Sequence, residues 1–107
     1  MKIVTLQDAP KMETPLGLDA RVAASAPEAE LVQFTLRPGE VIPPHPMPVR
    51  VFFVVLAGQG EITVGDRTDV VSRDQIVEIE PGVKRGWRAV GTETLRVLAV
   101  KTPRPVA

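Results

Sequence analysis

Apolar residues in this chain recur with a period of two over short runs, and no stretch of ten or more residues shows helical periodicity. Seventeen Val, five Ile and eight Thr make thirty of the 107 residues β-branched, which favours strands. Eight Gly and eleven Pro are scattered between these runs as turn residues. Many short strands separated by turns predict an antiparallel sandwich or barrel.

We expect strands wherever apolar residues alternate or run without interruption. Residues 31–36 alternate cleanly, with one face formed by Val32, Phe34 and Leu36. Residues 49–56 form a continuous apolar run broken only by Arg50, which is typical of a central strand covered on both faces. The same patterns predict further strands at residues 1–6, 21–24, 61–64, 68–71, 75–80, 87–90 and 94–101.

Glycine and proline predict how these strands are connected. Gly65-Asp66 places glycine where a type II′ turn needs it, and Pro81-Gly82 fits the two central positions of a type II turn. Five prolines lie between positions 38 and 48. Because they lack backbone donors, we expect this segment to be extended at a sheet edge or a rim.

Composition excludes several classes of function. Thirteen Lys/Arg balance thirteen Asp/Glu, and no long run of either sign provides the electrostatic footprint of nucleic-acid or anionic-membrane binding. The absence of cysteine excludes disulfides and thiolate metal sites. No apolar stretch approaches the ~18 residues of a membrane-spanning helix, and an aspartate and a proline early in the chain lead us to expect no signal peptide in the first residues. These observations predict a soluble, cytoplasmic protein without nucleic-acid or membrane partners.

Two segments of the chain resemble the two motifs of the cupin family. The first motif, G-x5-H-x-H-x3,4-E-x6-G, is similar to PGEVIPPHPM…VFFVVLAGQGEITV. The second motif, G-x5-P-x-G-x2-H-x3-N, is similar to DQIVEIEPGVKRGWRAV. Gly39 precedes His45 at the spacing of the first motif, and Gly58 closes it. Pro81-Gly82 aligns the second motif, in which IEPGVKRGWRA resembles the cupin phrase IPPGVPHGFRA. The resemblance covers residues 30–101. It implies an all-β, antiparallel double-stranded β-helix or jelly-roll barrel with a ligand site inside its mouth.

The chain departs from the cupin pattern where metal-dependent members hold a divalent cation with three histidines and a glutamate. His45 is retained, whereas Met47, Val51 and Arg85 stand at the other three positions. Valine cannot coordinate, a thioether suits soft Cu(I), and a guanidinium stays protonated. A dication 4 Å from that charge would be repelled by about 8 kcal/mol at an effective dielectric of 20. The departures predict that the chain holds no metal and needs no cofactor.

Acid–base catalysis also lacks an evident set of residues. The metal-free sugar epimerases of the superfamily pair a histidine base with a tyrosine acid, and this chain has no tyrosine. The nearest carboxylates that could serve as partners of His45 are those of Glu40, Glu61, Glu78 and Glu80. Alternation turns Glu78 away from the core, and Glu40 and Glu61 fall in or beside turns, so no acid–base pair can be assembled.

The resemblance places six candidate ligand-binding residues in the pocket. His45 is either a ligand contact or lone base, or a rim side chain satisfied by water. Arg85 either binds a carboxylate or phosphate, or turns outward to solvent or to a nearby glutamate. Alternation puts Trp87 on the same face as Arg85. Packing in the core is the alternative role for Val51 and Phe53. Lys84 and Arg88 flank Arg85 and support a positive mouth of the pocket, although ordinary solvated charge explains them too. The full set of candidates is His45, Met47, Val51, Phe53, Arg85 and Trp87.

These observations predict one domain over residues 1–107, with an N-terminal strand and arm at 1–29, a barrel at 30–101 and a tail at 102–107. The expected function is metal-free binding of a small, anionic or polar molecule by Arg85 and His45 over an apolar floor. One alternative is a small isomerase, lyase or hydrolase that uses His45 or an unrecognised metal site. Another is a structural or regulatory module with a vestigial pocket. Pairing of the strand at residues 2–6 with a second copy predicts a homodimer.

Overall fold

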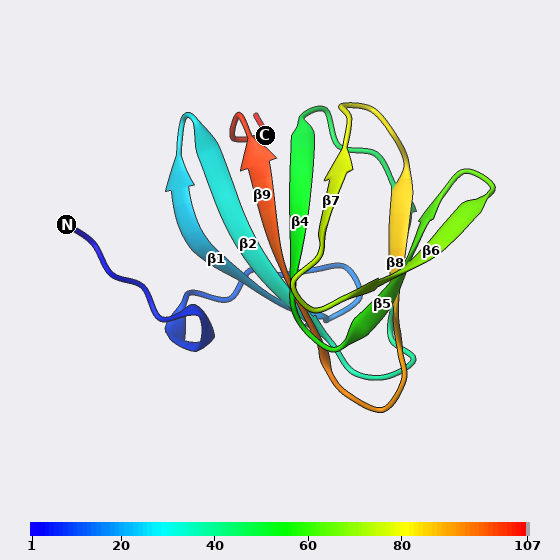
Figure 1. Ribbon diagram of the computed structural model, residues 1–107. Helices are drawn as coiled ribbons and strands as arrows, with labels where there is room; N and C mark the ends of the chain where they lie inside the picture. Colours follow the sequence, from blue (N-terminus) through cyan, green and yellow to red (C-terminus); the bar gives the residue numbers. More distant parts are fainter. Residues whose placement is uncertain (107) are drawn as a thin grey trace.

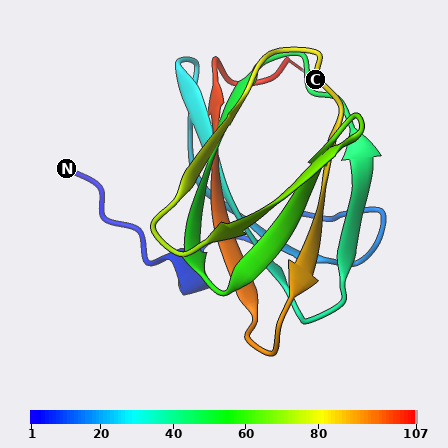
Figure 2. The same cartoon turned by 45° about the vertical axis from the view of Figure 1, so that its right-hand side comes forward.

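The computed structural model describes residues 1–106 and consists of two antiparallel sheets that face each other (Figure 1). The five-stranded sheet has the order β1 (Asp19–Ala26), β2 (Ala29–Leu36), β9 (Leu95–Thr102), β4 (Arg50–Ala57) and β7 (Ile76–Ile79). The four-stranded sheet has the order β3 (Val41–His45), β8 (Arg85–Val90), β5 (Gln59–Val64) and β6 (Arg67–Ser72). Figure 2 shows the same two sheets in a turned view.

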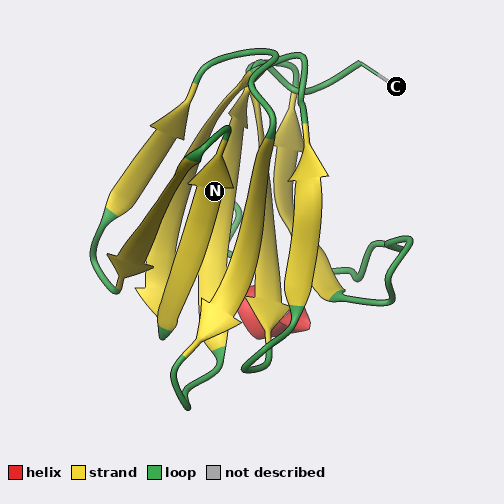
Figure 3. Ribbon diagram, turned by 90° about the vertical axis from the view of Figure 1, so that its right-hand side faces the viewer, coloured by secondary structure: helices red, strands yellow, loops and turns green. Residues whose placement is uncertain are grey.

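The all-β prediction is confirmed: the architecture is a double-stranded β-helix of antiparallel strands. Figure 3 shows strands throughout the molecule and one short helix at its base. That helix is the 3₁₀ segment η1 (Leu6–Asp8). Within residues 1–106, no helix has the length and apolar character needed to cross a membrane.

The core lies between the inward faces of the two sheets. In β4 and β9, alternate residues are buried. The apolar run at 49–56 was expected to be covered on both faces, but the intervening side chains of β4 are only partly buried, because the two-sheet fold of the described residues has no third layer over them. The central register pairs Val55 with Val97 and Phe53 with Ala99, which stacks apolar side chains in layers. The largest completely buried side chains belong to Leu36, Leu95, Val51, Val55 and Val97.

The strand expected at residues 1–6 is wrong. Residues 1–5 form no strand, and the chain enters η1 at Leu6. In Figures 1 and 2 this arm extends away from the sheets, so its backbone has no neighbouring strand with which to pair. The N-terminal strand is instead β1, which contains the expected segment 21–24 and extends it on both sides.

The proline-rich segment is extended at a sheet edge, as predicted. Pro43 and Pro44 lie in β3, which pairs only with β8 in the described chain. Glu78 of β7 points away from the core, as expected, and forms an ion pair with Arg50 of β4 on the outer face of the sheet. In the predicted tail, Thr102 still belongs to β9, and Ala107 lies outside the described residues.

Candidate functional site

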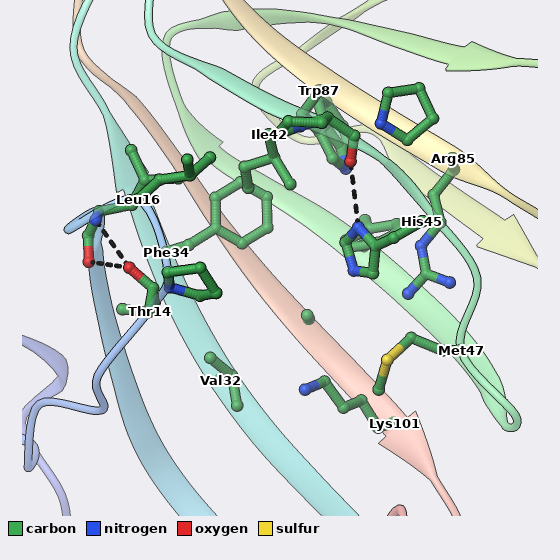
Figure 4. Close-up of a pocket in the computed structure, with 17 residues that line it drawn as sticks. Thr14, Leu16, Val32, Phe34, Ile42, His45, Met47, Arg85, Trp87 and Lys101 are labelled. Atoms are coloured by element: carbon green, nitrogen blue, oxygen red, sulfur yellow. Dashed lines mark hydrogen bonds between the residues drawn. The ribbon is translucent and has the colours of Figure 1, made fainter.

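A cavity of about 470 Å³ lies between the sheets (Figure 4). Its lining includes both buried and exposed side chains, so the cavity extends from the core to the surface. Both sheets contribute, and the loop that precedes β1 lies against it. The lining residues are Thr14, Pro15, Leu16, Leu18, Ala20, Val32, Phe34, Ile42, Pro43, Pro44, His45, Met47, Phe53, Arg85, Trp87, Ala99 and Lys101.

Arg85 provides a buried positive charge in this apolar cavity. It is the first residue of β8 and is 3% exposed. Among residues 1–106, its Nη1 has no hydrogen-bond partner and no carboxylate forms an ion pair with it. Its guanidinium carbon lies 5.6 Å from the centroid of the Phe53 ring, a cation–π contact. Burial lowers the pKa of Arg85 because desolvation disfavours the charged form.

An aromatic cluster stands beside Arg85. The rings of Phe34, Phe53 and Trp87 meet edge to face, with centroid separations of 5.3 to 6.2 Å. Trp87 lies two residues beyond Arg85 on β8, and both side chains line the cavity, as strand alternation predicted. The indole Nε1 of Trp87 is a second buried donor without a partner in the described chain.

His45 lies opposite Arg85 in the pairing of β3 with β8. Gly86 permits the close approach of these strands, since a Cβ there would lie 2.9 Å from the Ile42 carbonyl oxygen. The Nδ1 atom of His45 is 3.1 Å from the Pro43 carbonyl oxygen. A carbonyl only accepts, so Nδ1 carries the proton in this hydrogen bond and Nε2 of a neutral imidazole is an acceptor.

Lys101 is a cavity residue that our sequence analysis did not identify. Its Nζ lies 3.6 Å from Glu30 Oε1, and the two residues face each other across β2 and β9. A signal for its inward position was present, because strand alternation places Lys101 on the same face as the buried Ala99 and Val97. Figure 4 shows its amine turned toward the space that His45, Met47 and Arg85 also border.

The structure brings five of the six predicted residues to the cavity: His45, Met47, Phe53, Arg85 and Trp87. Val51 is not among the lining residues, because its side chain is completely buried in the core opposite Ile79 of β7. Ligand contact by the predicted set stays a prediction.

The charged residues that flank Arg85 in sequence do not line the cavity. Lys84 is exposed, and Arg88 is exposed and forms an ion pair with Glu61 on the outer face of β5 and β8. The structure therefore supports the interpretation of Lys84 and Arg88 as ordinary solvated charges.

The sequence analysis also missed the segment Thr14–Leu18, which lies against the cavity before β1 begins. The Thr14 Oγ1 atom accepts a hydrogen bond from the Leu18 amide at 2.7 Å and donates to the Leu18 carbonyl at 3.2 Å. Gly17, at φ 67°, allows the turn between them. No local pattern in the sequence reveals that a loop of this kind folds back over a distant pocket.

The double-stranded β-helix is the fold of a known protein family. Residues 32–101 match the family described as the cupin domain, which is more than half of the chain. The chain belongs to the cupin family. No curated protein sequence is significantly similar to this cupin.

Several solved structures share the architecture of this cupin. KdgF from Halomonas sp. superposes with a TM-score of 0.84 at 17% identity, over 96% of this chain and 95% of that one. The polyketide cyclase RemF from Streptomyces resistomycificus superposes with a TM-score of 0.86 at 22% identity, over 100% of this chain and 82% of that one. An RmlC-like cupin from Methanocaldococcus jannaschii superposes with a TM-score of 0.82 at 19% identity, over 98% of this chain and 93% of that one. At these identities the likeness shows the fold.

The cavity residues of this cupin do not fit the divalent cation that metal-dependent members hold. His45 is the chain's single histidine, and no cluster of three or more His, Cys, Asp or Glu side chains exists within residues 1–106. Arg85 places a permanent positive charge where a cation would need a donor, and Met47 contributes a soft thioether. The donor set of the described residues therefore does not fit a divalent cation.

Proposed function

We propose that this cupin binds a small organic anion in the cavity between its sheets. The observation that carries the proposal is Arg85, a buried guanidinium without a carboxylate partner on an apolar wall. An unpaired buried ion costs several kcal/mol in a folded protein. A bound anion would offset that cost through charge-assisted hydrogen bonds, which a guanidinium forms in bidentate geometry with carboxylates.

The rest of the cavity supports an organic ligand in preference to an inorganic ion. Its lining is dominated by aliphatic and aromatic side chains, and its volume of about 470 Å³ falls within the usual range of small-molecule sites. The similar fold of RemF, a polyketide cyclase, is consistent with a cupin barrel that accommodates an apolar organic molecule.

Calorimetric titration with octanoate and its neutral analogue octanamide tests this proposal. We expect octanoate to bind at least tenfold more tightly, because only the anion compensates the charge of Arg85. Arg85→Met should remove this preference, whereas Arg88→Met, on the outer face of the same strand, should retain it. Equal affinity for the two compounds, or a preference that survives Arg85→Met, would contradict the proposal.

A second candidate, an enzyme that uses His45 as a base, has one observation in its favour. The hydrogen bond to the Pro43 carbonyl fixes the proton of a neutral imidazole on Nδ1 and leaves Nε2 able to accept one. However, the titratable groups that line the cavity are His45, Arg85 and Lys101, so no carboxylate of the described chain complements a histidine base. Binding is therefore the better-supported function.

For oligomeric state, we propose the homodimer expected from the sequence. The arm carries the exposed side chains of Met1, Ile3 and Val4. Strand β1 is the edge strand of the five-stranded sheet, and in the described chain residues 10–12 pair with its outer side around Arg21 but leave the rest of that edge uncovered. Pairing with a second copy would cover both features. Light scattering after size exclusion should give the mass of two chains, and deletion of residues 1–5 should give one. A monomeric mass for the full chain would refute the dimer.

A further inference from the structure

We infer that the ligand is an apolar monocarboxylate that binds with its carboxylate at the buried end of the cavity, beside Arg85, and its tail directed toward the rim. This inference rests on the proposed anion-binding function and adds the charge, the chemical class and the orientation of the ligand.

The charges around the cavity select a single negative charge. Lys101 is already paired with Glu30, and the side chains of the two residues are only 15% and 21% exposed. His45 is exposed and bonded to a backbone carbonyl. Of the lysine and arginine side chains that line the cavity, Arg85 is therefore the one without an ion-pair partner among residues 1–106. A head group with one negative charge balances it, whereas a dianion would bury one charge in excess.

The two ends of the cavity differ in their chemistry, and this difference sets the orientation. The buried part of the lining includes both unpartnered donors, Arg85 Nη1 and Trp87 Nε1. The exposed rim is formed in large part by apolar side chains, among them Leu16, Pro43 and Pro44. Leu16 is 56% exposed although it lines the cavity, so a ligand tail is what would cover it.

The reverse orientation of the ligand, with its carboxylate at the rim and its tail inside, suits neither end of the cavity. A carboxylate at the rim would leave the guanidinium of Arg85 buried and unpaired, and it would place a hydrocarbon tail against that charge. Apart from His45, whose Nδ1 is bonded to the Pro43 carbonyl oxygen, the exposed lining residues are leucine and proline, whose side chains provide no donor to a carboxylate at the rim. The inserted head repays the desolvation of Arg85, and the tail buries the apolar rim at the same time.

Straight-chain alkanoates from butanoate to decanoate, titrated calorimetrically into the full-length protein, test the orientation. With the head inserted, affinity should increase about fourfold for each methylene that the cavity covers and should then level off as the tail passes the rim into solvent. A tail inserted first would instead give a sharp loss of affinity beyond the length that the closed end accommodates.

Leu16→Lys provides a second readout at an exposed position that is not required for the core. With the head inserted, this variant should weaken decanoate severalfold and leave butanoate unchanged, because only the long tail reaches residue 16. Val70→Lys is the matched control, since Val70 is 57% exposed and does not line the cavity. A gain in affinity for every alkanoate in Leu16→Lys would place the carboxylate at the rim and overturn the inference.

The outcomes separate the two proposals. If no alkanoate binds, the anion-binding function itself fails. If alkanoates bind with a preference that depends on Arg85, but affinity drops sharply with length or rises in Leu16→Lys, the function holds and the orientation is wrong. If suberate binds as tightly as octanoate at equal chain length, the cavity accepts a second charge and the monoanionic class is wrong.

Discussion

Replacing Arg85 by methionine is expected to stabilise the folded protein by about 2 kcal/mol while it removes anion binding. The substitution exchanges a buried, unpaired charge for an apolar side chain of similar length. Replacement of buried charges by well-packed apolar residues stabilises proteins by about 1–4 kcal/mol. The lost cation–π contact with Phe53 offsets part of this gain. Urea unfolding should show the increase, and the melting temperature should rise by roughly 10 °C.

The matched control for this stabilisation is Arg88→Met. Arg88 lies on the same strand but faces outward and pairs with Glu61, and exposed ion pairs contribute about 0–1 kcal/mol. We therefore expect Arg88→Met to be neutral or slightly destabilising. A loss of stability in Arg85→Met, with normal stability in Arg88→Met, would show that Arg85 is part of the core and not a charge held for a ligand.

The energetic cost of burying the unpaired charge of Arg85 depends on pH, and the direction of that dependence follows from the direction of the Arg85 pKa shift. Burial lowers the pKa of Arg85, so the unfolded chain holds the proton more tightly than the folded protein does. The penalty is complete below the folded-state pKa and is relieved only as pH rises through that pKa toward the higher pKa of the unfolded chain. At neutral pH, a bound anion offsets the cost and a change of buffer pH does not.

Gly58→Ala is expected to destabilise the fold by about 3 kcal/mol. Gly58 is the single residue between β4 of one sheet and β5 of the other, and its φ is 75°. A Cβ there would lie 2.5 Å from the Thr94 carbonyl oxygen and 2.9 Å from Leu95 Cα, both backbone atoms that cannot rotate away. Left-handed strain of about 1–2 kcal/mol adds to overpacking of about 1–3 kcal/mol.

Gly65→Ala separates these two contributions. Gly65 has a φ of 58°, but no atom lies within 4 Å of where its Cβ would stand. We expect this variant to lose only the backbone-strain contribution, about 1 kcal/mol of unfolding free energy, as measured by denaturant unfolding. Equal losses in the two variants would show that the contact with Thr94 and Leu95 relaxes without cost.

The sheets were predictable from the sequence because each strand carries its own signal. Alternation in residues 31–36 defines an inward face without reference to any neighbour, and the apolar run at 49–56 indicates a central strand but not which of its faces is inward. The same rule placed Arg85 and Trp87 on one face, and the structure confirms that both side chains line the cavity. The motif glycine Gly58 was recognised by its spacing, and the structure supplies its physical reason in the sheet-to-sheet crossing.

The features that the sequence did not reveal depend on contacts between distant segments. Residues 1–6 have a strand-like composition, but a strand forms only where a neighbour completes its hydrogen bonds, and this arm has no such neighbour in the described chain. The cavity wall at Thr14–Leu18 depends on the path of a loop. Val51 was assigned from motif alignment alone, and the depth at which a short side chain lies cannot be read from spacing.

The prolines of β3 have a consequence for which compounds can enter. Pro43 and Pro44 line the cavity but have no backbone N–H, so the main chain at these two residues offers carbonyl oxygens and no donor. For the proposed anion site, such an entrance would disfavour a molecule that carries an acid at both ends and would tolerate one whose trailing end is hydrocarbon or a hydroxyl. Selectivity would then begin before the guanidinium is reached.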